Sequence, residues 1–208
     1  MDEMTPQCAK CPPKLCVMGP SDNGPEYCPM QTTAEVYDEA RTIIAKPEVQ
    51  KMFRGVATTW KKSKLSKNRI EEIMIYARNM DFRKLGLAFC IGLSGEAEVV
   101  SALFEKEGFE VVSGCCMTGG FCSDDVGLSK EDKIYPDGRQ PQCNPVGQAL
   151  LMNKYGTDLN VILGLCVGDD ALFIKHSEAP VTVLAVKDRL NAHNPLAAIP
   201  QYRESLGM

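Results

Sequence analysis

Ten cysteines in a chain of 208 residues constrain this protein more than any other feature. Residues 1–10 are polar and already contain Cys8, so we expect no secretory signal. No stretch approaches the roughly 20 apolar residues that a membrane span requires, so we expect no membrane partner. We therefore expect a cytoplasmic protein. In that reducing compartment, metal ligation or thiol chemistry explains abundant cysteine better than a disulfide framework does.

Four of the cysteines lie in an N-terminal arm, residues 1–30, which is rich in proline and glycine and has no apolar period. They are Cys8, Cys11, Cys16 and Cys28, in the spacing C-x2-C-x4-C-x11-C-P. A segment that cannot bury an apolar face needs another source of order. Two thiolates separated by two residues reach one ion around a tight turn, and four thiolates complete a shell for zinc or a cubane iron–sulfur cluster.

Residues 31–208 predict an α/β domain, with a helical lead-in over 31–80 and a sheet core over 86–190. Apolar stripes with helical spacing occur at 36–44, 49–56 and 70–77, and short apolar runs typical of strands occur at 86–93, 109–114, 159–165 and 180–186. Strands that alternate with helices favour a doubly wound, mostly parallel sheet with helices on both faces. The cysteine-rich arm is expected to be irregular beside it.

Local signals predict where several of these helices begin and end. Ser94 is placed to cap the helix after the first strand. Asn144 precedes Pro145 and predicts a helix that runs to Tyr155 and stops at Gly156. Residues 119–142 read as a long polar loop, and a polar tail is expected after the last strand.

A second group of cysteines falls near the carboxyl ends of the expected strands. It comprises Cys90, Cys115 (or its neighbour Cys116), Cys143 and Cys166. Ligands of open parallel sheets bind beyond those ends, so this group predicts a second metal or thiol site. Core packing is the competing interpretation, because free cysteine behaves as a small hydrophobe. Candidates for binding an anionic ligand at the same edge are Ser94, Asn144, Gly168, Asp169 and Lys187.

Charge and missing motifs exclude several classes of protein. The formal net charge is −4, and the basic residues form no patch large enough to neutralise many phosphates, so we expect no nucleic-acid partner. The chain also lacks the H-E-x-x-H, G-x-S-x-G and G-x-G-x-x-G patterns of zinc proteases, serine hydrolases and dinucleotide-binding enzymes.

Several longer motifs resemble one family. They are Ala88-Phe-Cys-Ile-Gly-Leu93, Cys143-Asn-Pro-Val-Gly-Gln-Ala149, Gly164-Leu-Cys-Val-Gly168, Val186-Lys-Asp-Arg189 and His193-Asn-Pro195. Over nearly its whole length the chain resembles a cysteine-rich metal-binding family of unknown function (domain of unknown function eighteen forty-seven). The resemblance implies metal binding in the cytoplasm of an anaerobe and assigns no reaction. One departure from the family pattern is Asp169, which stands where a histidine is usual.

The leading hypothesis is a metal-binding protein that holds an iron–sulfur cluster, with 4Fe–4S favoured, for redox or small-ligand chemistry. Its partners would be a small-molecule ligand or an electron-transfer protein. The alternative is a zinc-stabilised binding or scaffold protein without catalysis. Thiol–disulfide exchange ranks third. The Cys8–Cys11 pair does not stand at the start of a helix after a strand, and a vicinal disulfide between Cys115 and Cys116 is strained.

Overall fold

The computed structural model of this chain describes residues 5–12, 14–19 and 24–208. It divides into two compact units, residues 1–57 and residues 58–208. The expected arm lies in the first unit, and its residues 1–4, 13 and 20–23 are outside the described part.

The first unit contains short turns followed by helices. Its elements are the 3-10 turns η1 (Cys8–Lys10) and η2 (Leu15–Met18) and the helices α1 (Pro29–Thr32) and α2 (Ala34–Ile44). Helix α3 (Pro47–Ser63) begins in this unit and ends in the second. The apolar stripes predicted α2 and α3, and Pro47 stands at the first position of α3, where its missing N–H costs no hydrogen bond. Every residue of α2 is at least partly exposed.

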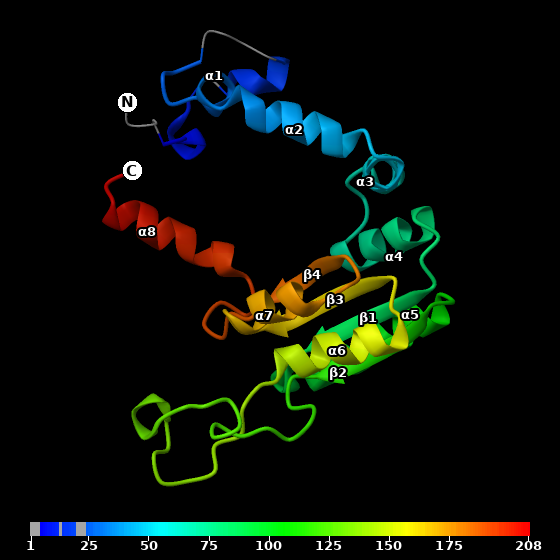
Figure 1. The fold of residues 1–208 in the computed structure, drawn as a ribbon, viewed down its shortest axis with the longest axis vertical. Coiled ribbons are helices and arrows are strands. Elements are labelled where there is room, and N and C mark those ends of the chain that lie inside the picture. Colours follow the sequence, from blue (N-terminus) through cyan, green and yellow to red (C-terminus); the bar gives the residue numbers. More distant parts are fainter. Residues whose placement is uncertain (1–4, 13, 20–23) are drawn as a thin grey trace. The chain divides into compact units, whose positions relative to one another are not determined.

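The second unit is an α/β domain, which confirms the predicted fold class (Figure 1). In chain order its elements are α4 (Arg69–Asn79), β1 (Lys84–Phe89), η3 (Ile91–Leu93), α5 (Ser94–Lys106), β2 (Glu110–Cys115), η4 (Lys130–Asp132), α6 (Pro145–Tyr155), β3 (Leu159–Leu165), α7 (Asp169–His176), β4 (Val181–Val186), η5 (Pro195–Ala198) and α8 (Ile199–Ser205). The four strands are parallel and lie in the order β2-β1-β3-β4.

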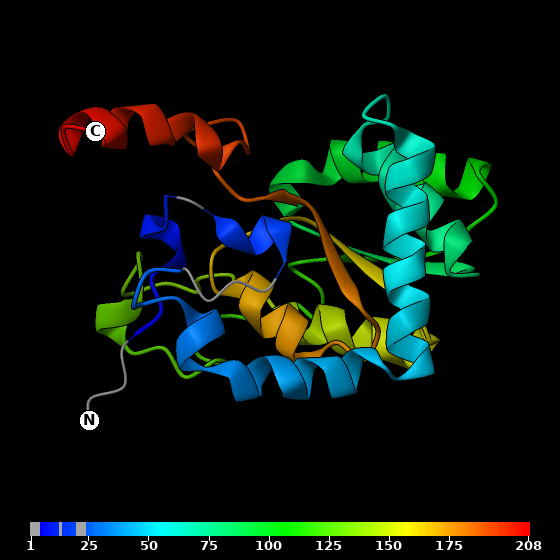
Figure 2. The ribbon, with the colours of Figure 1, turned by 90° about the horizontal axis from the view of Figure 1, so that it is seen from above.

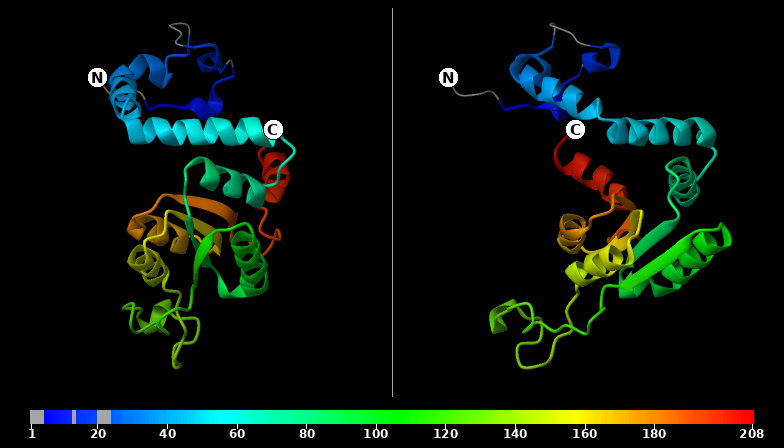
Figure 3. Two further views of the ribbon diagram at one scale, coloured as in Figure 1. Left: turned by 90° about the vertical axis from the view of Figure 1, so that its right-hand side faces the viewer. Right: turned by 45° about the vertical axis from the view of Figure 1, so that its right-hand side comes forward.

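Helices cover both faces of this sheet. Alternate residues of β1 point to opposite faces, so Leu85 and Leu87 join one apolar core while Ala88 joins the other. The first core includes side chains of α4 and α5, among them Phe104. The second core includes side chains of α6 and α7, among them Phe173. Figure 3 shows α5 and α6 on opposite sides of the strands.

The strand order reverses direction between β1 and β3. The chain passes from β1 through α5 to β2, and then crosses back through α6 to reach β3 on the other side of β1. In doubly wound sheets, ligands bind beyond the carboxyl ends of the strands at such a switch point. Cys90 directly follows β1 and Cys166 directly follows β3, so both lie at this point.

Three elements differ from the sequence predictions. The strand expected over residues 86–93 ends at Phe89, because Ile91–Leu93 turns as η3 and still buries Leu93 in the first core. Ser94 is therefore the first residue of α5 rather than its cap, and its hydroxyl donates to the Ile91 carbonyl at 2.7 Å. The expected polar tail forms η5 and α8, which Figure 2 shows following β4.

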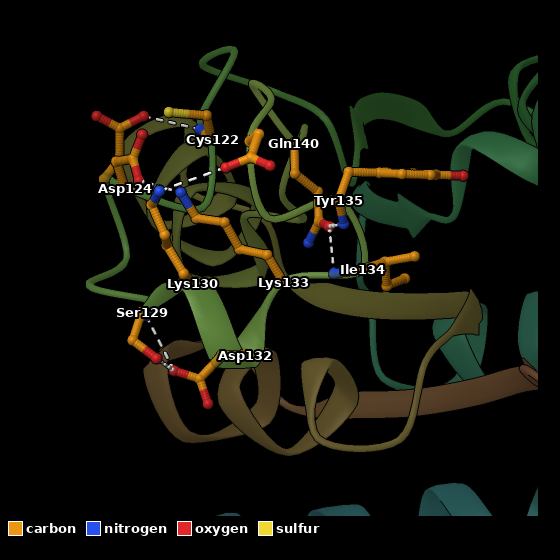
Figure 4. A network of polar contacts seen from close by, with 11 residues as sticks. Cys122, Asp124, Ser129, Lys130, Asp132, Lys133, Ile134, Tyr135 and Gln140 are labelled. Atoms are coloured by element: carbon orange, nitrogen blue, oxygen red, sulfur yellow. Dashed lines mark hydrogen bonds and ion pairs between the residues drawn. The ribbon is translucent and has the colours of Figure 1, made fainter.

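The long loop between β2 and α6 is held by its own hydrogen bonds (Figure 4). The Lys133 ammonium pairs with the Asp124 carboxylate, and the Lys133 side chain is only 8% exposed. The Gln140 side-chain oxygen accepts backbone N–H groups from Ile134 at 2.8 Å and Tyr135 at 3.3 Å. Residues 119–142 therefore form an ordered loop whose ends converge beside the carboxyl edge of the sheet.

Candidate functional site

The four cysteines of the arm line one cavity. Its volume is about 180 Å³, and its walls include Cys8, Cys11, Cys16 and Cys28. All four are free thiols and each is at least partly exposed. The structure therefore brings together the four cysteines that the sequence spacing grouped, although three short segments of chain carry them.

Neighbouring groups shape this cavity. The Lys14 ammonium donates to the backbone carbonyls of Cys8 at 2.6 Å and Cys11 at 2.5 Å, which fixes the turn that carries both thiols. Gly24 approaches Cys28 so closely that a Cβ at position 24 would lie 3.0 Å from the Cys28 sulfur. The absence of a side chain at Gly24 leaves this thiol free to turn toward the cavity.

The described residues contain no ready-made coordination shell for a single ion. Among residues 5–12, 14–19 and 24–208, no three histidine, cysteine or carboxylate side chains converge closely enough to hold one. The thiols of the arm line the walls of a cavity and do not converge on one position that an ion could occupy. Thiolate sulfur remains the donor that suits zinc and iron–sulfur clusters, so the chemistry of the donor set fits both.

A second set of sulfurs lies at the carboxyl edge of the sheet. Cys116 follows β2 and is 1% exposed, and Cys143 immediately precedes the cap of α6 and is half-buried. The Cys143 thiol lies near Cys116 and near Asp169 at the start of α7, because both groups contribute to raising its pKa. Of the two neighbouring cysteines that the sequence left as alternatives, the one that reaches Cys143 is Cys116. Cys115 ends β2 and packs half-buried against the second core.

Burial changes the proton affinities of all three groups. Desolvation raises the pKa of Cys116, while the Ile91 backbone N–H, which donates to its sulfur at 3.3 Å, acts in the opposite direction. Desolvation, with the nearby Cys116 and Asp169, raises the pKa of Cys143. Desolvation also raises the pKa of Asp169. Perturbed pKa values that gather at one edge of a sheet mark a candidate functional site, although buried structural groups also show them.

Two cations lie on the same edge, after β4. A Cβ at Gly92 would be 3.2 Å from the Lys187 ammonium nitrogen and 3.9 Å from the Cys90 sulfur, so both groups approach the backbone that follows β1. The Arg189 guanidinium donates to the Cys166 sulfur at 3.7 Å. The structure thus places Cys90 and Cys166, both predicted site residues, beside positive charge.

The remaining predicted ligand-binding residues have mainly structural partners. The Asn144 side chain accepts from the Gly147 N–H at 2.8 Å, as a cap should, and donates to the Thr118 carbonyl at 3.1 Å. The Gly168 N–H donates to the Asp170 carboxylate at 3.0 Å, directly before α7.

Sequence reasoning missed Gln148 in α6. Its side chain is fully buried, and its amide nitrogen donates to the backbone carbonyls of Phe89 at 3.2 Å and Gly114 at 2.7 Å. These bonds tie the ends of β1 and β2 beneath Cys90 and Cys116. The available signal was a polar residue at a position of α6 that its neighbour Ala149 and Met152 mark as buried.

No helix in the described part of the chain combines the length and the apolar character that a bilayer crossing demands.

Comparison with known proteins agrees with the motifs. The family model described as "Protein of unknown function (DUF1847)" matches residues 28–184. An uncharacterized protein of Methanocaldococcus jannaschii, MJ0455, is 38% identical over 193 residues, which are 93% of this chain and 93% of the relative. The resemblance inferred from the sequence is confirmed, and the chain belongs to the DUF1847 family.

Proposed function

We propose that this chain is a metal-binding protein whose arm cysteines hold an iron–sulfur cluster. The observation that carries the proposal is that all four thiols of the arm line one cavity of about 180 Å³. Four thiolates are the ligand set of a 4Fe–4S cluster. A single zinc ion binds its sulfurs at about 2.3 Å and needs much less space than this cavity provides.

The residues of the arm have distinct parts in this proposal. Cys8, Cys11, Cys16 and Cys28 are the ligands, and Lys14 holds the turn between the first two of them. Pro25, Pro29 and Met30 add apolar walls that limit the access of water. Because the thiols do not yet converge on one point, metal binding and ordering of the arm would occur together.

When bound, a 4Fe–4S cluster supplies one-electron transfer or, at an iron with an open position, binding of a small ligand. The chain would then serve redox or small-ligand chemistry with an electron-transfer partner or a small molecule. The half-buried thiols, Lys187 and Arg189 at the carboxyl edge of the sheet support a ligand site there, because this is where doubly wound sheets bind ligands.

The test is the ultraviolet–visible spectrum of protein purified without oxygen, together with iron, zinc and sulfide analysis. We expect a brown protein with equal amounts of iron and sulfide, whose absorption bleaches on reduction. Cys11→Ser and Cys28→Ser should lose most of the iron. Cys122→Ser is the matched control and should retain it, because Cys122 lies in the loop of the other unit.

A finer test uses Gly24. The variant Gly24→Val places a side chain against the Cys28 sulfur and should lower iron content while the second unit stays folded. A colourless protein with stoichiometric zinc and no sulfide would overturn the cluster and leave a zinc-stabilised binding or scaffold protein. A protein that binds neither metal after reconstitution would overturn metal binding altogether.

A further inference from the structure

We propose that the free edge of β2 and the groove beside it bind an extended, basic peptide segment of a partner protein, which adds to the four-stranded sheet as a further strand. All of the residues involved lie in the second unit, on β1, α5 and β2. The inference goes beyond the proposed cluster and does not rest on it.

The two edges of the sheet differ. β2 and β4 are the outermost strands, and Figure 1 shows them on opposite sides of β1 and β3. The edge of β4 is covered, since the Arg69 side chain donates to the Val183 carbonyl at 3.1 Å and to the Thr182 hydroxyl at 3.0 Å. The register of β4 also shifts along the strand, and such irregularities protect an edge from pairing. Among residues 5–12, 14–19 and 24–208, no strand pairs with the outer side of β2.

The hydrogen bonds between β1 and β2 show which backbone groups of β2 are free. The Glu110 N–H donates to the Arg83 carbonyl and the Cys116 N–H donates to the Phe89 carbonyl, both at 2.9 Å. In a parallel pair, alternate residues of one strand bond to the same neighbour, so every second residue from Glu110 to Cys116 faces β1. The N–H groups that point outward are those of Val111, Ser113 and Cys115. They form the row of donors that an added strand needs.

A groove of about 320 Å³ lies beside this edge, between α5 and the strands. Its walls include Phe89 of β1, Ser113 of β2, and Ser94, Glu98, Ser101 and Glu105 of α5. The α5 residues follow one another at intervals of three or four, so they lie along one face of the helix. Side chains of an added strand alternate between the two faces of the sheet, so every second one would project toward this groove.

Charge in the groove favours a basic segment. The charged residues that line it are Glu98 and Glu105, which are exposed and have no ion pair in the described contacts. Glu110, at the start of β2, is already paired with Lys84 at 2.9 Å. Lys106 follows Glu105 in the chain but does not line the groove. The groove is therefore negative and lacks a cation of its own.

Spacing and charge identify the occupant as a partner's segment. Glu98 and Glu105 lie about 10 Å apart along the helix axis. Two basic residues that are two to four positions apart in an extended strand span about 7–13 Å, so lysine or arginine side chains would reach both carboxylates. Antiparallel pairing of β2 with a second copy of itself would instead bring these carboxylates toward their equivalents, and like charges across an interface repel.

The experiment uses the full chain and two synthetic octapeptides, one of alternating valine and lysine and one of alternating valine and glutamate. Calorimetric titration at low salt measures binding, and NMR hydrogen exchange follows single amides. We expect the valine–lysine peptide to bind at least about tenfold more tightly. The amides of Val111, Ser113 and Cys115 should then exchange at least about tenfold more slowly, and those of Val112 and Gly114, which already face β1, should not change.

Matched peptides and variants separate main-chain pairing from charge. A valine–lysine peptide that is N-methylated at every residue has no N–H groups and should not bind. Glu98→Gln and Glu105→Gln should each weaken binding about threefold. Glu96→Gln makes the same change on α5 outside the groove and should leave binding unchanged. Ser113→Pro removes the central donor of the free edge, a position where proline is tolerated, and should abolish binding.

The amide map of the wild-type protein decides the proposal even if a variant does not fold. Absence of binding, equal binding of the two peptides, or protection of amides elsewhere would overturn it. Protection of the outward amides of β2 without any peptide, in a chain that sediments as a dimer, would show that a second copy occupies the edge and would also overturn it.

Discussion

Gly86 on β1 and Asn160 on β3 are register partners, and the Asn160 side chain occupies the space that a side chain at position 86 would need. A Cβ at Gly86 would lie 2.1 Å from the Asn160 side-chain oxygen and 2.6 Å from the Met152 sulfur. The Asn160 amide is fully buried, accepts from the Thr157 hydroxyl at 2.7 Å and donates to the Ser177 hydroxyl at 2.6 Å. The Asn160 side chain therefore fills the space over Gly86 between the sheet and α6.

Gly86→Ala should lower the free energy of unfolding by about 3 kcal/mol, the upper part of the usual range for overpacking a core. The reason is that Asn160 cannot move away without breaking its buried hydrogen bonds. Urea denaturation followed by circular dichroism measures the change. Gly95→Ala is the control: nothing lies within 4 Å of its Cβ in α5, so it should stabilise by about 0.5 kcal/mol. Equal stability of the two variants would contradict the packing described for Gly86.

Gln148→Glu should destabilise the second unit strongly. The amide nitrogen of Gln148 donates to two carbonyls, and a carboxylate would place an acceptor against both in a buried position. Gln148→Leu removes the donor without adding charge and should cost about 1–3 kcal/mol. Thermal and urea denaturation compare both with the exposed control Gln201→Glu, which should leave stability unchanged. A Glu variant as stable as the wild type would show that the two carbonyls do not need this donor.

Asp169→Asn should make the protein more stable at pH 7. Desolvation raises the pKa of Asp169 in the folded state, so the fold favours the protonated carboxyl. Its contribution to stability is present at pH below the unfolded pKa and is lost as the pH rises through the folded pKa. Asparagine resembles the protonated form and avoids this loss. The unfolding midpoint, measured from pH 3 to pH 8, should show a gain for the variant that disappears near about pH 4.

The matched control for this pH dependence is Asp170→Asn. The Asp170 carboxylate accepts N–H groups from Gly168 and Ala171, so its loss should weaken the start of α7 rather than stabilise it. If Asp169→Asn were less stable than the wild type at pH 7, the described environment of Asp169 would be wrong.

Removal of the metal should unfold the first unit and leave the second unit folded. Helix α2 is at least partly exposed along its whole length, so the proposed metal would supply much of the order in residues 1–57. The second unit has two apolar cores of its own. After oxidation and chelation, trypsin should cleave at Arg41 and Lys51 while residues 69–186 remain intact by mass spectrometry. Cleavage that is equally fast with and without metal would contradict this dependence.

Signals that act over a few residues were sufficient to predict many elements. Asn144, Pro145 and Gly156 marked both ends of α6, because a cap, a proline and a left-handed glycine each act on the adjacent turn. The apolar run at 159–165 matches β3 residue for residue. The same reasoning failed at η3. The apolar run continues past the end of the strand there, because the turn that follows also places Leu93 in the first core.

Prediction of the candidate sites depended both on local spacing along the chain and on the topology of the sheet. The spacing of Cys8, Cys11, Cys16 and Cys28 grouped four residues that line one cavity, since short chain segments keep such residues close. At the sheet edge, the rule that parallel strands end together brought Cys90 and Cys166 to one place. The choice between Cys115 and Cys116 remained open, because both contact the second core and only the tertiary structure shows that Cys116 is the more deeply buried of the two.

The sequence by itself therefore determined the α/β class, the parallel sheet and the two groups of cysteines, because periodicity and capping depend on near neighbours. Only the tertiary structure decided that Cys143 lies close enough to Cys116 and Asp169 for both to raise its pKa, and that the Gln148 side chain bonds to the ends of β1 and β2. These residues are distant in the chain, and their approach depends on the register of β1 against its neighbours and on the packing of α6 across the sheet. Both follow from contacts that no local pattern of residues encodes.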